Sequence, residues 1–203
     1  MGPFVRTANK LKKMWLRFAL HDIRYSNNYN KLDRIYMVSD PWNMASPAQQ
    51  YRFAETNRII IERFGRVGSL LEIGCGEGHQ SLQLQQICDH LIGLDVSNKA
   101  VARARRRCPE SEFLVGDVFS KEVRTRAPFD LVVACEVLYY MSDVPAALRL
   151  IRELGRNCLV TYFAGEIDNM DLQVSSFPGA VSEMLEFEQA RRWRAVWWRG
   201  ERV

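Results

Sequence analysis

The chain reads SLLEIGCGEGH over residues 69–79, and this stretch decides the fold that we predict. An apolar run ends at Ile73, glycine then stands at every second position, and a helical pattern follows. An apolar run bounded by glycine is typical of a buried parallel strand that leads into a tight turn. Glycine suits that turn because it tolerates unusual backbone angles and lets a ligand approach the main chain closely. The stretch therefore predicts a nucleotide-binding turn within a strand–turn–helix unit.

Apolar runs and helical patterns alternate through most of the remaining chain. We expect strands at residues 69–73, 90–95, 111–115, 129–135 and 157–163, with helices at 79–88, 97–107, 119–126 and 143–154. This alternation is typical of a doubly wound sheet with right-handed crossovers. After Phe177-Pro178-Gly179 we expect a helix through Met184, then two antiparallel strands over residues 185–199. The predicted fold is α/β and Rossmann-like, with seven strands and an antiparallel edge strand.

The N-terminal part differs from this pattern and predicts a separate unit. Residues 4–20 have the spacing of a basic amphipathic helix, and a short helix fits residues 31–38. Ser46-Pro47 then begins a helix that runs to residue 64. We therefore divide the chain into a basic helical extension or lid, residues 1–45, and a main domain, residues 46–203. The first helix has two open interpretations, a brace on the domain or a weak contact with a membrane surface.

Composition indicates an ordinary globular protein and excludes several classes. The 203 residues are 47% hydrophobic and carry a formal net charge of +4, and no window has the ~20 apolar residues of a membrane span. The five cysteines form no CxxC pair and have no metal-ligand spacing to the three histidines, so we predict no metal site. Scattered thiols in core elements indicate a reducing compartment, and we expect a cytoplasmic location.

The spacing of glycines and acids narrows the choice of nucleotide. Glycines 74, 76 and 78 fall one position short of the dinucleotide pattern GxGxxG, and the Gly-Lys-Ser/Thr of a triphosphate loop is absent. Asp95 ends the second expected strand, and Asp117 follows the third in Gly116-Asp117-Val118. Ligands of open α/β sheets bind at the carboxyl ends of the strands, and a carboxylate at Asp95 can accept both ribose hydroxyls.

These motifs, with Glu136-Val137-Leu138-Tyr139-Tyr140 after the fourth strand, resemble those of the class I S-adenosylmethionine-dependent methyltransferases. More narrowly, residues 38–165 resemble the nodulation protein S type of methyltransferase. Asp40-Pro41-Trp42 and residues 51–56 are among the stretches that carry this resemblance. The best-known member of that family N-methylates the amino sugar of a chitooligosaccharide. The resemblance implies S-adenosylmethionine as cofactor, S-adenosylhomocysteine as product and a small-molecule or saccharide acceptor, with N-methylation ahead of O-methylation.

The resemblance also implies roles for individual residues. An amine acceptor must be neutral to attack, and a carboxylate or phenol can take or guide its proton. The candidate catalytic residues are therefore Glu136, Tyr139, Tyr140 and His79, although one of the tyrosines and the histidine also fit structural roles. Trp42 and Tyr51 fit either a lid or the core. The candidate cofactor-binding residues are Trp42, Glu72, Gly74, Cys75, Gly76, Asp95, Val96, Asp117, Val118 and Glu136.

Two alternatives of other classes remain open. Trp193, Trp197 and Trp198 alternate with arginines, as in base-stacking surfaces, which would suit an RNA methyltransferase. We favour packing of one face of a closing strand pair, so nucleic acid is not an expected partner. A non-catalytic protein that binds S-adenosylmethionine is the other alternative, and the intact donor motifs argue against it. Both a monomer and a homodimer fit the sequence.

Overall fold

The structure is a computed structural model that describes residues 26, 28–164 and 170–200. The predicted helix over residues 4–20 lies outside the described residues. The strands are β1 Val67–Ile73, β2 Cys88–Asp95, β3 Glu112–Val115, β4 Leu131–Cys135, β5 Asn157–Phe163, β6 Val181–Phe187 and β7 Arg191–Arg199. The α-helices are α2 Tyr29–Ile35, α3 Pro47–Phe64, α4 Ser81–Leu84, α5 Asn98–Arg107, α6 Lys121–Arg124, α7 Val144–Leu154 and α8 Met170–Ser175, and η1 Leu138–Tyr140 is a 3₁₀ turn.

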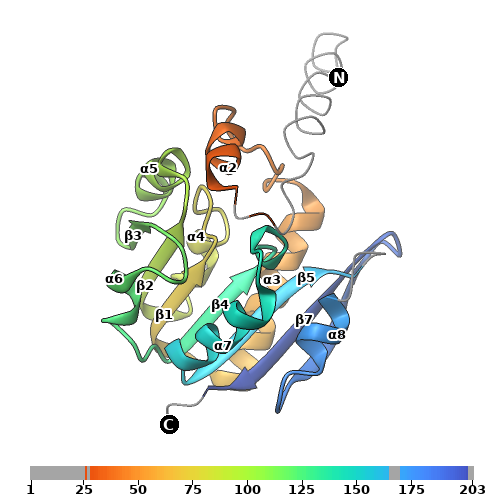
Figure 1. Cartoon of the computed structure of the whole chain (residues 1–203). Helices are drawn as coiled ribbons and strands as arrows, with labels where there is room; N and C mark the ends of the chain where they lie inside the picture. Colours follow the sequence, from red (N-terminus) through yellow and green to blue (C-terminus); the bar gives the residue numbers. More distant parts are fainter. Residues whose placement is uncertain (1–25, 27, 165–169, 201–203) are drawn as a thin grey trace.

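All seven described strands form one sheet with helices on both faces (Figure 1). Their order is β3-β2-β1-β4-β5-β7-β6. The first five are parallel, and β7 runs antiparallel to both β5 and β6. From β1 the chain adds β2 and β3 on one side of the sheet, and it then adds β4 and β5 on the other side. This change of side between β1 and β4 creates the crevice where open α/β sheets bind ligands. The predicted Rossmann-like fold with an antiparallel edge is therefore confirmed.

Three predicted helices are wrong in type or extent. The segment after Gly179 forms β6 instead of a helix through Met184, and it pairs with β7 from Val181↔Trp197 to Phe187↔Arg191. The ladder bonds to β7 and burial of Leu185 outweigh the local helix preference of this stretch. The helix expected over 79–88 shrinks to α4, because β2 already begins at Cys88. The helix expected over 119–126 is only the single turn α6.

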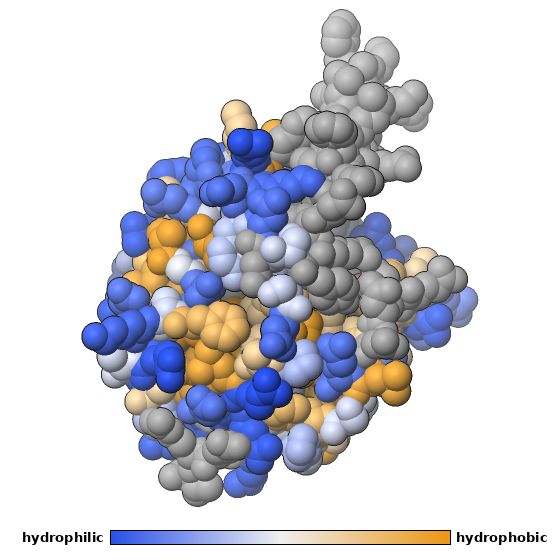
Figure 2. All heavy atoms as spheres, viewed as in Figure 1, coloured by the Kyte–Doolittle hydropathy of each residue, from blue (hydrophilic) through white to orange (hydrophobic). Residues whose placement is uncertain are grey.

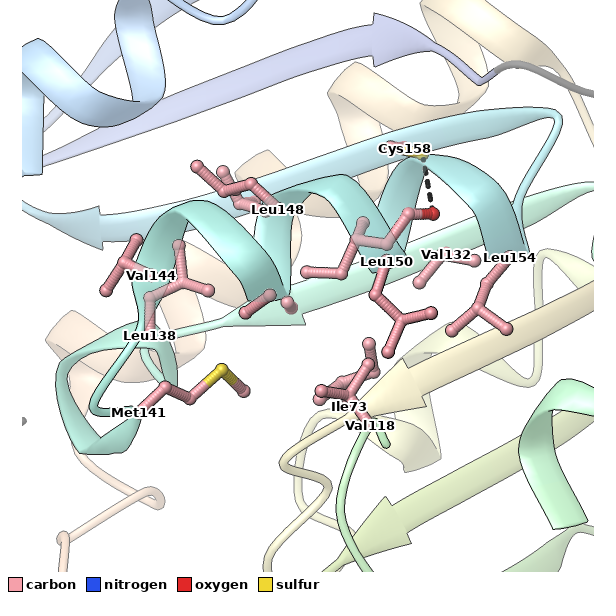
Figure 3. Packing of buried hydrophobic residues seen from close by; sticks show 14 of the residues in the cluster. Ile73, Val118, Val132, Leu138, Met141, Val144, Leu148, Leu150, Leu154 and Cys158 are labelled. Atoms are coloured by element: carbon pink, nitrogen blue, oxygen red, sulfur yellow. Dashed lines mark hydrogen bonds between the residues drawn. The ribbon is translucent and has the colours of Figure 1, made fainter. Parts of the chain in front are cut away.

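One core lies between the sheet and the helices α6, α7 and α8. Figure 3 shows apolar side chains of α7 directed onto Ile73 of β1 and Val132 of β4. Helix α7 begins where the Asp143 carboxylate accepts the Ala146 N–H at 2.8 Å. Its helical spacing turns a continuous apolar face to the sheet. This packing fixes the end of β4, from which the candidate acceptor-side residues project.

The other core lies under α3 and α4, with α5 covering the β2–β3 end of the same face. Helix α3 starts after the extended Ser46 and ends at Gly65, whose φ is 71°. It packs Ile59 and Ile60 onto the sheet. Trp193 and Trp197 are buried in this core, and Trp198 is buried in the opposite one, so all three pack instead of forming an exposed stacking surface.

The outer surface is mixed in polarity. In Figure 2 hydrophobic residues gather near the middle of the visible face and hydrophilic residues surround them. Within the described ranges, no helix combines the length and apolar character that crossing a bilayer requires.

Candidate functional site

The glycine turn after β1 is shaped by its neighbours. Gly74 has a φ of 75°, and a Cβ built there would lie 2.6 Å from Val137 Cγ2. The N–H groups of Gly74 and Cys75 both donate to Leu94 O, at 2.7 and 3.0 Å. The turn is therefore tied to the end of β2, and only a residue without a side chain fits at Gly74.

Asp95 fixes the same turn from the end of β2. Its Oδ2 accepts the Gly76 N–H and its Oδ1 accepts the Ser97 N–H, both at 2.9 Å. Burial raises the pKa of Asp95 to about 6, although these two hydrogen bonds lower it. A carboxylate has about four acceptor positions, so two remain for ligand hydroxyls.

Glu72 lies beneath the turn and is almost fully buried. The Ser81 hydroxyl at the start of α4 donates to Glu72 Oε2. Burial raises the pKa of Glu72 to about 8, although the Ser81 bond and the charge of Arg52 lower it. The carboxyl group therefore favours its neutral form below that pH.

A segment that precedes α3 covers the turn. Helix α2 places Tyr29 against Asp117, and burial together with this acid raises the pKa of the phenol to about 12. Tyr36 Oη accepts the Trp42 indole N–H at 3.2 Å and lies 3.0 Å from a Cβ built on Gly76. The described part of the predicted lid, residues 28–45, therefore contributes side chains to the site.

Glu77 holds this segment against the turn. Both of its carboxylate oxygens accept the Asp40 N–H at 3.0 Å, and Arg103 Nη1 donates to Oε1 at 2.5 Å. His79 Nε2 lies 3.5 Å from Glu77 Oε2, so the histidine contacts Glu77 and also lines the cavity. Burial raises the pKa of Glu77, but His79, Arg103 and the Asp40 N–H lower it to about 2. The group is thus an anion that joins the turn to the covering loop.

The candidate acceptor-side residues meet at the end of β4. Glu136 has a φ of 58°, donates its N–H to Thr161 O at 2.8 Å, and has one buried oxygen, Oε1, without a hydrogen-bond partner among the described residues. Burial raises its pKa, and Arg52 and hydrogen bonds from Tyr139 and Trp193 oppose that rise. Tyr139 Oη accepts the backbone N–H of Phe163, and burial raises the pKa of this phenol. Its ring is therefore fixed in place.

These elements enclose a cavity of about 220 Å³. Every candidate residue predicted from the sequence lines it, whereas Tyr51 lies outside and packs on Phe187 with the ring centroids 5.4 Å apart. Tyr140 is a partly exposed wall residue, and its ring lies 5.9 Å from that of Trp42. The lining residues include Trp42, Glu72, Gly74, Cys75, Gly76, His79, Asp95, Val96, Asp117, Val118, Glu136, Tyr139 and Tyr140.

Several lining residues were not predicted, and Arg52 is the most notable among them. It stands on the buried side of α3 together with Ala48, Thr56 and Ile59, so a charged residue interrupts an apolar helical stripe. That interruption is a sequence signal that could have marked Arg52. Glu77 and Tyr36 gave no comparable signal, because their roles depend on contacts across 37 and 40 residues of chain.

Residues 25–168 match the family model described as nodulation protein S (NodS). The chain belongs to this family. It is 36% identical over 132 residues to nodulation protein S of Sinorhizobium fredii, which covers 63% of this chain and 60% of the relative. It is 34% identical over 131 residues to that of Bradyrhizobium diazoefficiens, covering 63% and 61%. The chain thus spans about three fifths of the length of these relatives.

Solved structures support the same fold. The N-methyltransferase NodS of Bradyrhizobium japonicum, in complex with S-adenosylhomocysteine, aligns with a TM-score of 0.69 at 22% identity, over 87% of this chain and 100% of that one. A magnesium protoporphyrin IX methyltransferase of Synechocystis with bound S-adenosylmethionine aligns with a TM-score of 0.60 at 17% identity, over 94% and 97%. The predicted resemblance to NodS-like methyltransferases is therefore confirmed at the level of family and fold.

Proposed function

We propose that this protein is an S-adenosylmethionine-dependent methyltransferase that acts on a small-molecule or saccharide acceptor, with transfer to nitrogen favoured over oxygen. The observation that carries this proposal is the arrangement of Gly74, Asp95, Asp117 and Glu136. They follow the ends of four neighbouring strands, in the order Asp117, Asp95, Gly74 and Glu136 across the sheet, and all of them line one cavity. Relatives in the family carry the name nodulation protein S, and one solved neighbour is described as an N-methyltransferase.

The cavity residues fit the donor chemically. Asp95 has acceptor positions left for ribose hydroxyls, and Asp117 with the Val118 N–H suits an adenine edge. The side-chain-free turn at Gly74 and Gly76 leaves room for the methionyl and ribose parts. When bound, S-adenosylmethionine supplies an electrophilic methyl group on a sulfonium.

The remaining residues position the acceptor and exclude water. Correct alignment of the reacting groups can contribute about 7–11 kcal/mol to catalysis. The unpartnered Glu136 Oε1 can accept an N–H or O–H of the acceptor and hold its proton. Trp42 and Tyr140, whose rings contact each other, close the cavity beside it. A structural neighbour described as an amino pentose methyltransferase, with a TM-score of 0.56, supports an amino sugar among the acceptors tested first.

We also propose that residues 1–45 act as a lid on a methyltransferase domain of residues 46–203. Tyr29, Tyr36 and Trp42 support this division, because they reach the cavity from outside the sheet domain.

We propose the cytoplasm as the location of the protein. Its five buried free cysteines, 75, 88, 108, 135 and 158, are compatible with a reducing compartment. The buried tryptophans remove the main argument for an RNA substrate.

Calorimetric titration and product analysis test the proposal. We expect wild-type protein to bind S-adenosylhomocysteine and Asp95→Asn to bind it at least about tenfold more weakly, since a hydrogen bond to a charged group contributes about 1.5–3 kcal/mol. Incubation with S-adenosylmethionine and amino-sugar oligosaccharides should give a product heavier by one methyl group. Absence of binding by the wild type refutes the proposal, and binding without conversion across an acceptor panel favours a non-catalytic binding protein.

A further inference from the structure

Helices α2 and α5 lie next to each other and carry an excess of positive charge (Figure 1). Asp33 of α2 accepts the Ser97 hydroxyl at 2.7 Å and pairs with Lys99 of α5. The two helices hold seven lysines and arginines, two in α2 and five in α5, and Asp33 is their only acid. Residues 25–203 as a whole hold 22 basic and 23 acidic side chains. Positive charge is therefore concentrated on this pair of helices.

Two apolar side chains are exposed beside this charge. Met37 is 69% exposed and Val38 is 38% exposed, in the loop that follows α2. The Met37 N–H donates to Arg34 O at 3.0 Å, so this loop continues the turn of the helix. Val38 O accepts a hydrogen bond from Arg103 Nη1 of α5 at 3.3 Å, which joins the loop to the second helix. We call this surface the basic face, and it consists of Arg34, Met37, Val38, Lys99, Arg103 and Arg106.

The cations of the basic face are only partly neutralised by the protein. Lys99 and Arg103 each pair with one acid. Arg34 and Arg106 are exposed and form no ion pair with any residue that the structure describes. Arg106 follows Arg103 by about one helical turn, so the two lie on the same side of α5. A surface that keeps such a charge excess attracts an anionic partner.

The exposed aliphatic side chains favour a lipid surface over a nucleic acid as this partner. Single-stranded nucleic acids are held by aromatic side chains on which bases stack. The basic face has no aromatic residue, and Trp193, Trp197 and Trp198 are buried. Membrane-surface segments instead combine Lys and Arg with apolar side chains that enter the headgroup boundary. The first 24 residues, which lead into α2, add six basic side chains against one acid.

We propose that the basic face docks on the surface of an anionic lipid bilayer. Its cations lie at the headgroups, and Met37 and Val38 enter the boundary beneath them. The inference goes beyond the proposed function and does not depend on it. Tyr36 and Trp42 line the cavity from the same covering segment, so docking brings this segment against the bilayer. The cytoplasmic leaflet of membranes is anionic, which agrees with the location that we propose.

Co-sedimentation of the full chain with vesicles tests the basic face. One set of vesicles is phosphatidylcholine alone, and the other is an equal mixture of phosphatidylcholine and phosphatidylglycerol. Binding to the mixed vesicles should be tighter and should fall at least about tenfold between about 0.05 and 0.5 M salt, because salt screens the attraction. Arg34→Ser and Arg106→Ser should each weaken it about fivefold, the loss expected for one cation near an anionic surface. Met37→Ser should weaken it about three- to tenfold.

Two matched control substitutions lie outside the basic face. Arg149→Ser removes an exposed arginine of α7, which packs on the opposite side of the sheet. Leu172→Ser removes a side chain of α8 that is 69% exposed, the same fraction as for Met37. Both should leave vesicle binding unchanged. All five variants should unfold at the wild-type temperature, because substitutions of exposed side chains have little effect on stability.

Four outcomes overturn the inference. The first is absence of wild-type binding to the mixed vesicles at low salt. The second is salt-sensitive binding that all three variants of the basic face retain, because the first 24 residues would then carry the contact. The third is an equal loss in Arg149→Ser, which would make net charge the cause. The fourth is tighter binding to polyuridylic acid than to the vesicles, without loss in Met37→Ser. None of these outcomes involves S-adenosylhomocysteine, so titration with that ligand decides the proposed function separately.

Discussion

Glu77 is the residue on which we expect closure of the cavity to depend. Its carboxylate accepts the Asp40 N–H at 3.0 Å from each oxygen and pairs with Arg103 at 2.5 Å, while its side chain is 4% exposed. These contacts lower its pKa from 4.5 to about 2. Because the folded-state pKa lies below the unfolded one, Glu77 stabilises the fold above about pH 4.5, and this contribution is lost as pH falls toward 2.

The pKa shift of Glu77 sets the size of its contribution to folding stability. Lowering the pKa from 4.5 to about 2 corresponds to about 3 kcal/mol. Arg103 is 24% exposed, so solvent screening reduces the expected loss for Glu77→Gln at pH 7 to about 1–2 kcal/mol. Urea unfolding followed by tryptophan fluorescence measures it. The difference between wild type and variant should stay constant above about pH 5 and shrink as pH falls to 3.

A matched control and a local probe sharpen this test. Glu62→Gln removes an exposed carboxylate that bonds to Arg58 on α3, and it should change stability by less than about 0.5 kcal/mol. Hydrogen exchange should be faster at the Asp40 amide in Glu77→Gln, since its acceptor loses its charge. A stability difference that does not vary between pH 5 and 3, together with unchanged exchange at Asp40, would show that other contacts hold the loop.

Two further predictions concern stability. Burial raises the pKa of Glu72 to about 8, so its contribution is present below about pH 4.5 and lost as pH rises through 8. Wild type should therefore lose about 2–4 kcal/mol relative to Glu72→Gln between pH 5 and 8 in urea unfolding, and parallel pH profiles would contradict this. In β6, Leu185→Ala should cost about 2–4 kcal/mol, because Leu185 is 1% exposed, whereas Met184→Ala at 39% exposure should cost under about 1. Equal shifts in thermal unfolding would contradict the assigned strand faces.

The donor side of the site was predictable because its signals are local in sequence. Each strand runs into its own turn, so Gly74, Asp95, Asp117 and Glu136 follow apolar runs directly. The carboxyl ends of parallel strands then meet at one edge of the sheet without further information. All four residues line one cavity, and their roles in binding stay predictions.

The closing strand pair was less predictable, because its backbone partners are remote in sequence. The stretch before Leu185 has residues that suit a helix, and only pairing with β7 makes it a strand. The shortening of α4 has a similar cause, since the register Val67↔Cys88 fixes where β2 begins. Local preference is weak compared with a complete set of ladder hydrogen bonds.

The sequence by itself determined the glycine turn, the order of the acids and the family resemblance, because spacing along one chain encodes each strand–turn–helix unit. The tertiary structure alone decided which charges meet. Glu77 joins the covering loop to the turn, and Arg52 reaches Thr161 at the end of β5 from a helix that precedes the whole sheet. Such contacts depend on burial and on pairing between distant segments, and no local pattern of residues specifies them.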